Sequence, residues 1–395
     1  MNTAVAINTS PPEPASDGHD RVPFFAWTSF LAVCSAVIGV QWDIAWHRSV
    51  GRDTFFSPPH LAIYLGGVLS GLACGYLILS TTFSRSAAAQ RARDSAVGIW
   101  GFHGPLGAFL SAWGGLAMLA SAPFDNWWHN TYGLDVTILS PPHTVLVLGI
   151  VGVELGGALL LTGARNQASG TARRILAALF LAIGGLVLVG LLTFEMEFTG
   201  RVLQHGAAFY RAVAVVAPLV LLGMGRASGQ RFGATLTAAV YSAILLLLLW
   251  IFPLVHTTPK LGPVYFPTTH LVPEGFPLLL IAPALAMDLG QPALSAQTPW
   301  RQAAVLGLLF LGSLLLAQWP MADFLMSPAA RNWVFGSHYQ SYDAQPHWTS
   351  VLNIYTVTEP TQAAFYFRLL GAYATAVVSA RLGLSWAAFL RQLRR

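Results

Sequence analysis

Residues 175–192 read ILAALFLAIGGLVLVGLL, an apolar run that contains no charged side chain. A helix of about 20 such residues is long enough to cross the hydrocarbon core of a bilayer. The rest of the chain has the same character, because 55% of its 395 residues are hydrophobic, only 9% are charged and the mean hydropathy is +0.58. These values exclude a water-soluble globular protein and predict an integral membrane protein.

Similar apolar runs along the chain predict an all-α integral membrane protein with about ten transmembrane helices. We expect these spans near residues 23–46, 59–83, 98–124, 142–164, 175–196, 208–225, 233–255, 276–292, 303–325 and 361–383. Three regions follow from this pattern: a disordered tail over 1–22, a four-helix region over 23–165, and about six further helices with long outer loops over 166–395.

Arginine residues indicate the orientation of these spans. They follow the second, fourth, sixth and eighth predicted spans and also close the chain, as at Arg85, Arg173, Arg226, Arg301 and Arg395. Because Lys and Arg accumulate in cytoplasmic loops, both termini are predicted to lie in the cytoplasm of a cell with a bacterial-type inner membrane. The net charge of +5 is spread over separate loops, which argues against a nucleic-acid partner.

Two segments of the chain repeat one pattern of metal-capable side chains. Each reads Asp-x3-His, then Gly-x-Asp, then Ser-Pro-Pro-His, and chance does not produce such a pattern twice. The first copy comprises Asp43, His47, Gly51, Asp53 and the run from Ser57 to His60, and the second comprises Asp125, His129, Gly133, Asp135 and the run from Ser140 to His143.

The spacing of the repeat predicts a ligand set in each copy. Residues four apart share one helix face, so each Asp-x3-His pair would direct a carboxylate and an imidazole to one point. Proline is tolerated in the first turn of a helix, so Pro-Pro should open the returning helix and bring His60 or His143 back to that point. Each hairpin would thus offer two imidazoles and one carboxylate at the outer membrane boundary. Asp53 and Asp135 are candidates to orient an imidazole.

These residues resemble a known family. The motif Asp43-x3-His47-x12-His60 is similar to the first metal site in the C subunit of the copper membrane monooxygenases, which include particulate methane monooxygenase and ammonia monooxygenase. The second motif resembles that subunit's other site, in which the family typically has Asn where this chain has Asp125. The resemblance covers about Trp42 to Gly149, and no part of the chain resembles the soluble domains of the family's B subunit.

The resemblance implies a copper-dependent monooxygenase, or its metal-bearing subunit, that activates dioxygen to hydroxylate a small nonpolar substrate. It implies one or two copper sites, further membrane subunits, a trimeric complex as one form of assembly, and an electron donor that the sequence does not identify. The catalytic and metal-binding residues would be Asp43, His47, His60, Asp125, His129 and His143.

Several alternatives stay open at this point. Iron also suits two imidazoles with one carboxylate. The protein could instead be a non-catalytic copper-binding or assembly subunit, or a metal transporter, and the Asp–His pairs could simply fasten the hairpins. His256-x13-His270 echoes the second motif without its Asp and is a weaker candidate for a third site. Glu154 and Arg368 fall within predicted spans, so we expect both to be paired inside the bundle.

Overall fold

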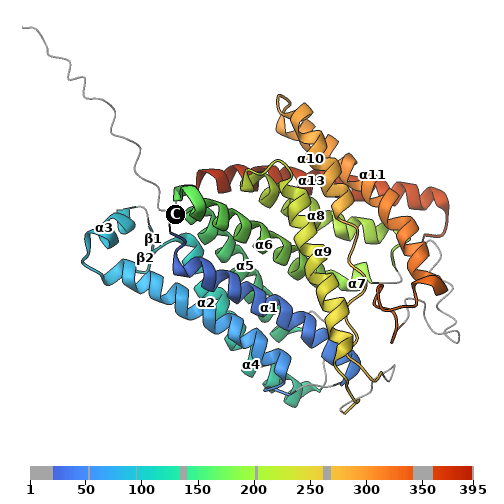
Figure 1. The fold of residues 1–395 in the computed structure, drawn as a ribbon, viewed down its shortest axis with the longest axis horizontal. Coiled ribbons are helices and arrows are strands. Elements are labelled where there is room, and N and C mark those ends of the chain that lie inside the picture. Colours follow the sequence, from blue (N-terminus) through green and yellow to red (C-terminus); the bar gives the residue numbers. More distant parts are fainter. Residues whose placement is uncertain are drawn as a thin grey trace, which may run out of the picture.

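The computed structural model describes residues 21–51, 54–94, 96–133, 140–200, 203–260, 268–340 and 359–393. This part of the chain is almost entirely helical (Figure 1). Its elements in chain order are α1 (Phe24–Ser49), α2 (Pro58–Phe83), α3 (Ala87–Asp94), β1 (Val97–Ile99), β2 (Phe102–Gly104), α4 (Leu106–Tyr132), α5 (Pro141–Gln167), α6 (Gly170–Phe194), α7 (Met196–Thr199), α8 (Ala207–Ser228), α9 (Gly233–Ile251), η1 (Phe252–Leu254), α10 (Ile281–Leu294), α11 (Pro299–Met326), η2 (Pro328–Ala330) and α13 (Gln362–Gln392). The tail predicted over residues 1–22 lies outside the described residues except for its last two.

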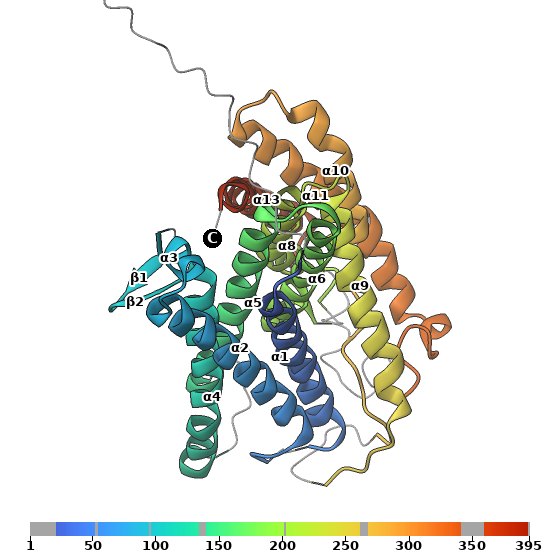
Figure 2. The ribbon, with the colours of Figure 1, turned by 60° about the vertical axis from the view of Figure 1, so that its left-hand side comes forward.

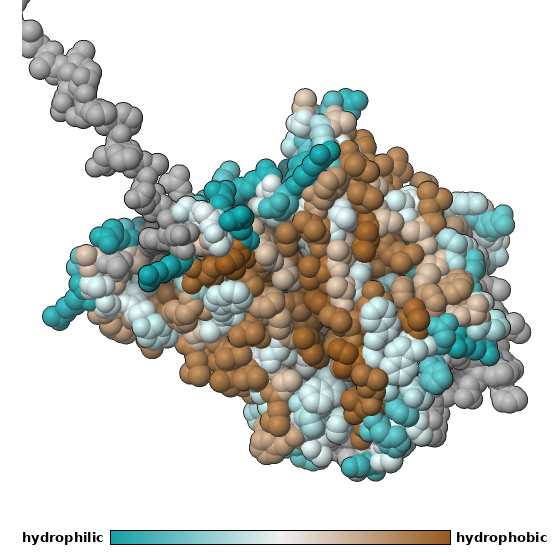
Figure 3. All heavy atoms as spheres, viewed as in Figure 1, coloured by the Kyte–Doolittle hydropathy of each residue, from teal (hydrophilic) through white to brown (hydrophobic). Residues whose placement is uncertain are grey.

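Nine helices within the described residues are long and apolar enough to cross a membrane. They are α1, α2, α4, α5, α6, α8, α9, α11 and α13. Exposed apolar side chains such as Leu72 and Leu316 cover their outward faces, and polar residues gather toward opposite edges of the molecule (Figure 3). This arrangement confirms the prediction of an all-α, multi-pass membrane protein.

The structure differs from the prediction at residues 276–292. The helix there, α10, has 14 residues, which corresponds to a length of about 21 Å and is too short for a ~30 Å hydrocarbon core. Residues 271–280, which precede it, lack regular secondary structure, and Pro273 and Pro277 each remove a backbone donor that a helix would use. This crossing is therefore part extended chain and part helix.

Side chains from three helices satisfy the backbone of this extended segment. Val272 N–H donates to Ser49 Oγ on α1 (2.8 Å), and Leu279 N–H donates to Gln318 Oε1 on α11 (2.9 Å). A third donor, the N–H of Leu278, reaches the hydroxyl of Tyr241 on α9 (3.3 Å). Non-helical backbone at membrane depth is tolerated where protein groups surround it, as they do here.

The third predicted span also begins later than expected. Residues 97–104 form an antiparallel hairpin in which Gly98 faces His103. Its turn residues Trp100 and Gly101 have φ of 50° and 85°. Gly101 adopts its positive φ without the strain that a side chain would cause. Helix α4 begins only after Pro105 and then continues to Tyr132.

Close helix contacts hold the four helices of the repeat together. α1 and α4 each pack against both α2 and α5, so the four helices form a closed ring. At the α4–α5 contact a Cβ on Gly114 would lie 2.6 Å from Gly149 O, and a Cβ on Gly156 would lie 2.6 Å from Gly107 O. Glycines thus allow the two backbones to touch, as small residues do in membrane helices generally.

Helix α6 joins this ring to the rest of the molecule. It packs against α1 and α5 on one side and against α8 and α9 on the other, and its residues Leu176, Phe180 and Ile183 are buried. Figure 2 shows α2 and α4 at one side of the molecule and α9, α10 and α11 at the other. One hydrophobic core therefore runs through both regions of the chain.

Helix ends that were predicted to share the cytoplasmic side lie together. Asn166 at the end of α5 donates to Leu393 O after α13 (2.7 Å), and Arg391 on α13 donates to Arg226 O at the end of α8 (2.6 Å). The metal-capable residues lie at the opposite ends of α1, α4 and α5. Which end faces the cytoplasm stays a prediction.

Candidate metal centre

The first set of candidate ligands lies where α1 ends and α2 begins. Asp43 and His47 stand one turn apart near the end of α1, and His60 is in the first turn of α2. His47 Nε2 lies 3.6 Å from Asp43 Oδ2, and His60 Nε2 lies 3.5 Å from Asp43 Oδ1. The two imidazoles therefore approach opposite oxygens of one carboxylate.

The second set has the same layout at the end of α4 and the start of α5. His129 Nε2 lies 3.4 Å from Asp125 Oδ1, and His143 Nε2 lies 3.5 Å from the same oxygen. One ligand atom from each of the three residues lies within 4.8 Å of the other two. Here both imidazoles converge on a single carboxylate oxygen.

The backbone explains why both sets form. Gly51 and Gly133, at equivalent positions of the repeat, have φ of 98° and 92° just after the helices that carry the Asp-x3-His pairs. Such φ values favour glycine and end the helix. Pro58 and Pro141 then occupy the first position of the returning helices, as predicted. The chain thus reverses direction in both copies and brings the third ligand back.

The second set fits a metal ion on geometric grounds. A tetrahedral ion with bonds of about 2.1 Å places neighbouring ligand atoms about 3.4 Å apart, which matches the separations around Asp125 Oδ1. Moreover, His129 Nδ1 lies 3.2 Å from Gly133 O. A proton on Nδ1 would be donated to that carbonyl and leave the Nε2 lone pair for a metal, which is the usual arrangement of metal-bound histidine.

Both sets open into one cavity of about 180 Å³. Asp43, His47 and His60 line it from the first set, and Asp125 and His143 line it from the second. Sequence reasoning placed the two sets in separate hairpins and did not foresee that they would share a cavity.

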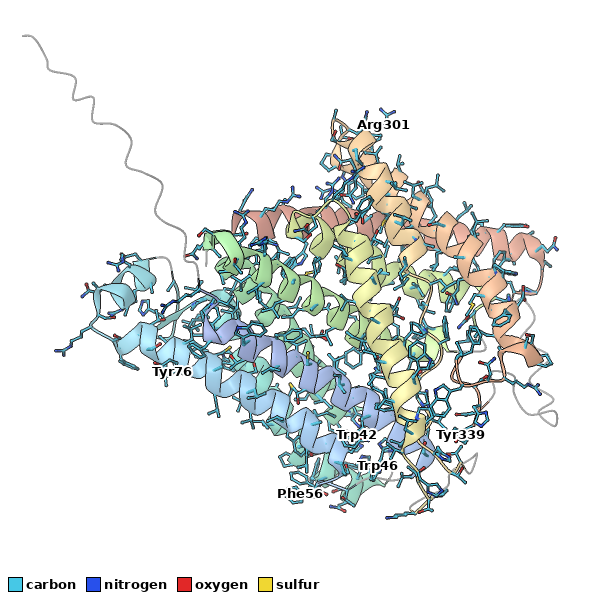
Figure 4. All side chains as sticks on the ribbon, in the orientation of Figure 1. Trp42, Trp46, Phe56, Tyr76, Arg301 and Tyr339 are labelled. Carbon is cyan, nitrogen blue, oxygen red and sulfur yellow. The ribbon has the colours of Figure 1, made fainter. Side chains whose placement is uncertain are left out.

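The remaining walls of this cavity, which we call the metal-side cavity, are mostly apolar. They come from all four helices of the ring, from the end of α6 and from the start of α7, and include Val40, Ile44, Ile63, Leu146, Val147, Ile150, Phe194 and Met196. Phe56 and Trp127 nearby are 72% and 52% exposed, as in an interfacial aromatic belt. Figure 4 places Trp42, Trp46 and Phe56 at this end of the molecule.

The weaker candidates are less well placed. His256 and His270 do face each other across a β-bridge, with ring centroids 5.1 Å apart. However, the His270 ring stacks on Tyr339 at 4.1 Å, and its Nδ1 lies 2.8 Å from Thr269 Oγ1. No carboxylate from the described residues is placed with them as in the two sets. Asp53 and Asp135 lie outside the described residues.

The expectation that Glu154 and Arg368 are paired inside the bundle was wrong for Glu154, whereas Arg368 is paired but lies at the exposed surface of α13. Arg368 is 59% exposed, and its Nη1 lies 3.8 Å from Glu359 Oε1. Glu154 is 1% exposed, yet neither carboxyl oxygen has a hydrogen-bond partner among the described residues. A Cβ at Gly190 of α6 would overlap Glu154 Oε1. Because glycine has no side chain, position 190 leaves room for the carboxyl group of Glu154.

Some residues of the metal-side cavity carried no recognisable signal in the sequence. Tyr64, Ser121, Thr193 and Met196 line it, but nothing in their local pattern distinguishes them from other residues of a membrane helix. Thr193 lies on α6 and Met196 begins α7, so only the packing of α6 against the ring brings these two residues to the cavity. Comparison with known proteins adds no identity, since no protein-family model, no curated protein and no solved structure matches this chain.

Proposed function

We propose that the protein is a copper-dependent membrane monooxygenase, or the metal-bearing subunit of one, that hydroxylates a small nonpolar substrate. The observation that carries the proposal is that a single, mostly apolar cavity is lined by all three residues of the first Asp–His–His set and by Asp125 and His143 of the second. The resemblance of the first motif to the C subunit of the copper membrane monooxygenases favours copper over iron, which the same ligand types would also accept.

The reaction would consume two electrons and two protons: RH + O₂ + 2e⁻ + 2H⁺ → ROH + H₂O. Bound copper would supply the redox chemistry, and an external donor would supply the electrons. Asp43 and Asp125 would offset the charge of the ions, while the imidazoles would fix their positions. Ile63, Leu146 and Ile150 would concentrate a nonpolar substrate and exclude bulk water.

The proposed site faces the outer side of a bacterial-type inner membrane, because the basic loops mark the other side as cytoplasmic. In this arrangement both substrate and dioxygen reach the metal-side cavity from the bilayer. We further propose that additional membrane subunits complete the enzyme, with a trimeric complex as one form, because the described residues form membrane helices and short connections and no electron-transfer domain is found among them.

A transporter is the alternative with a specific observation in its favour. The broken crossing at residues 271–294 is of a kind that transporters use at their binding sites. Its extended part, however, does not line the metal-side cavity. The candidate ligands also lie near the ends of their helices, whereas transporters bind near the bilayer midplane.

A non-catalytic copper-binding subunit would keep the metal and lack turnover.

Metal content tests the proposal. The protein is purified natively under copper-replete, chelator-free conditions, and its transition metals are counted by mass spectrometry for the wild type, His60→Ala and His143→Ala. We expect each variant to lose the copper of its own set. The matched control is His103→Ala, since His103 lies on β2 away from both sets and should leave the copper content unchanged.

The possible results separate the alternatives. No bound transition metal in the wild type would rule out the enzyme and leave the Asp–His pairs as fasteners of the hairpins. Iron in place of copper would change the cofactor but keep the site. Copper without oxygen-dependent hydroxylation, assayed with a donor present, would favour the non-catalytic subunit.

A further inference from the structure

A second cavity, of about 200 Å³, lies beside the metal-side cavity. Helix α1 lies between the two cavities, and different faces of this helix line each of them. Asp43 and His47, four residues apart, line the metal-side cavity, whereas Gln41 and Arg48, seven apart, line the second cavity. One helix thus presents ligands to one space and neutral or cationic polar groups to the other.

The second cavity, which we call the polar cavity, is rich in hydrogen-bonding groups. Gln41, Arg48, Gln204, Tyr241 and Glu274 all line it. An ion pair lies on its wall, with Arg48 Nη2 2.6 Å from Glu274 Oε1, and these two side chains are 28% and 25% exposed. The broken crossing contributes Glu274 and the residues after it, so this cavity supplies a polar setting for non-helical backbone.

The wall between the two cavities is thin. Thr193 and Met196 line both of them. At this wall Gln41 Nε2 donates to Thr193 Oγ1 (2.6 Å), and the Thr193 hydroxyl donates in turn to Val189 O (2.6 Å). Thr193 is therefore a polar residue on the wall of both an apolar and a polar space.

We propose that the polar cavity is a hydrated exit chamber through which the hydroxylated product and water leave the metal-side cavity, with Thr193 and Gln41 as the gate. This inference rests on the proposed monooxygenase function. A new hydroxyl group costs about 1–3 kcal/mol in an apolar space that does not bond it. A hydroxylated product formed beside Ile150 therefore has a lower free energy in the polar cavity than in the metal-side cavity. The nonpolar substrate has no such preference for the polar cavity.

The first test asks whether water reaches the gate, and it needs neither metal nor turnover. The chain has only two cysteines, Cys34 and Cys74, so both are replaced by serine. Thr193→Cys is then added and exposed, in sealed vesicles with the outer face outward, to a small membrane-impermeant cationic thiosulfonate. The control is Leu188→Cys on the same helix, where Leu188 is fully buried. We expect Thr193→Cys to react at least about tenfold faster than the control.

Labelling of Thr193→Cys no faster than the control, while a small membrane-permeant maleimide still modifies it, would overturn the hydrated chamber. Faster labelling of Thr193→Cys would still show a hydrated chamber even if the wild type proved to bind no copper. The failure of this inference is therefore distinguishable from the failure of the proposed function.

The second test asks whether the product uses this route. Thr193→Val keeps the shape of the side chain and removes the hydroxyl, whereas Thr193→Ser keeps the hydroxyl. We expect Thr193→Val to slow product release about tenfold, the effect of losing one hydrogen bond, with copper content and kcat/KM unchanged and with rescue in Thr193→Ser. Product release in Thr193→Val at the wild-type rate would refute the exit route, even with the cysteine labelled.

Discussion

The two Asp–His–His sets have the same residues but opposite patterns of exposure. In the first set the α1 histidine, His47, is 49% exposed and His60 is 16% exposed. In the second set the α4 histidine, His129, is only 17% exposed and His143 is 35% exposed. A repeat in sequence therefore does not guarantee equal environments, because each copy packs against different neighbours.

The sets also differ in how closely the ligand atoms converge. The imidazoles of the second set share one oxygen of Asp125, whereas those of the first set approach the two oxygens of Asp43 separately. His129 is further oriented by Gly133 O. Because a preorganised ligand loses less freedom on binding, we expect the second set to hold a metal ion more tightly.

Removing the histidine of the first helix in each copy should give the largest effect. We expect His129→Ala to lower copper affinity at the second set by more than about 100-fold, and His47→Ala to have a smaller effect on the first set because His47 is half exposed. Copper affinity of each variant is measured by competition with a chelator of known strength. Equal losses would remove the proposed difference between the sets.

The glycine that follows each Asp-x3-His pair allows a test of how the backbone orients the histidine. Gly133→Ala places a Cβ at φ 92° and disturbs the carbonyl that orients His129, so we expect copper affinity to fall about 10- to 100-fold. Gly51→Ala imposes a similar backbone strain at φ 98° and serves as the matched control. Affinity is again measured by chelator competition. A loss at the second set no greater than that in the control would mean that strain alone, and not the carbonyl, is responsible.

The effect of helix packing on stability can be compared at two glycines of the helices that carry the sets. Gly114→Ala on α4 would push a Cβ to 2.6 Å from Gly149 O, so we expect it to destabilise the fold by about 1–3 kcal/mol. Gly71→Ala on α2 meets nothing within 4 Å and should be neutral or slightly stabilising. Thermal unfolding in detergent measures both. A stable Gly114→Ala protein would show that α4 and α5 tolerate a wider separation.

The smallest effect should come from a carboxyl group at the end of α6, next in sequence to two residues that line the metal-side cavity. Burial raises the pKa of Glu195, between Phe194 and Met196, to about 7. An acid whose pKa is higher in the folded than in the unfolded state favours folding when protonated, so stability should fall as pH rises from about 4.5 to about 7. Glu195→Gln should flatten this part of the profile of melting temperature against pH. An unchanged profile would mean that Glu195 is solvated.

Much of the fold followed from local sequence. Nine of the predicted spans are helices of the expected kind, because an apolar run of sufficient length satisfies its own backbone hydrogen bonds wherever it lies in the bilayer. The turn chemistry of the repeat was equally local, since Gly51 and Gly133 end one helix while Pro58 and Pro141 open the next. The segment at 276–292 was misjudged because composition does not reveal where the chain stays extended.

By itself, the sequence determined the membrane class, the repeat and the pairing of each Asp with a histidine one turn away. These features depend on composition and on residues within about 20 positions of one another. Only the tertiary structure decided that both sets share one cavity, that Thr193 reaches two cavities and that Glu154 packs against Gly190. Such contacts depend on which helix faces meet, and that choice depends on side-chain shapes far apart in the chain.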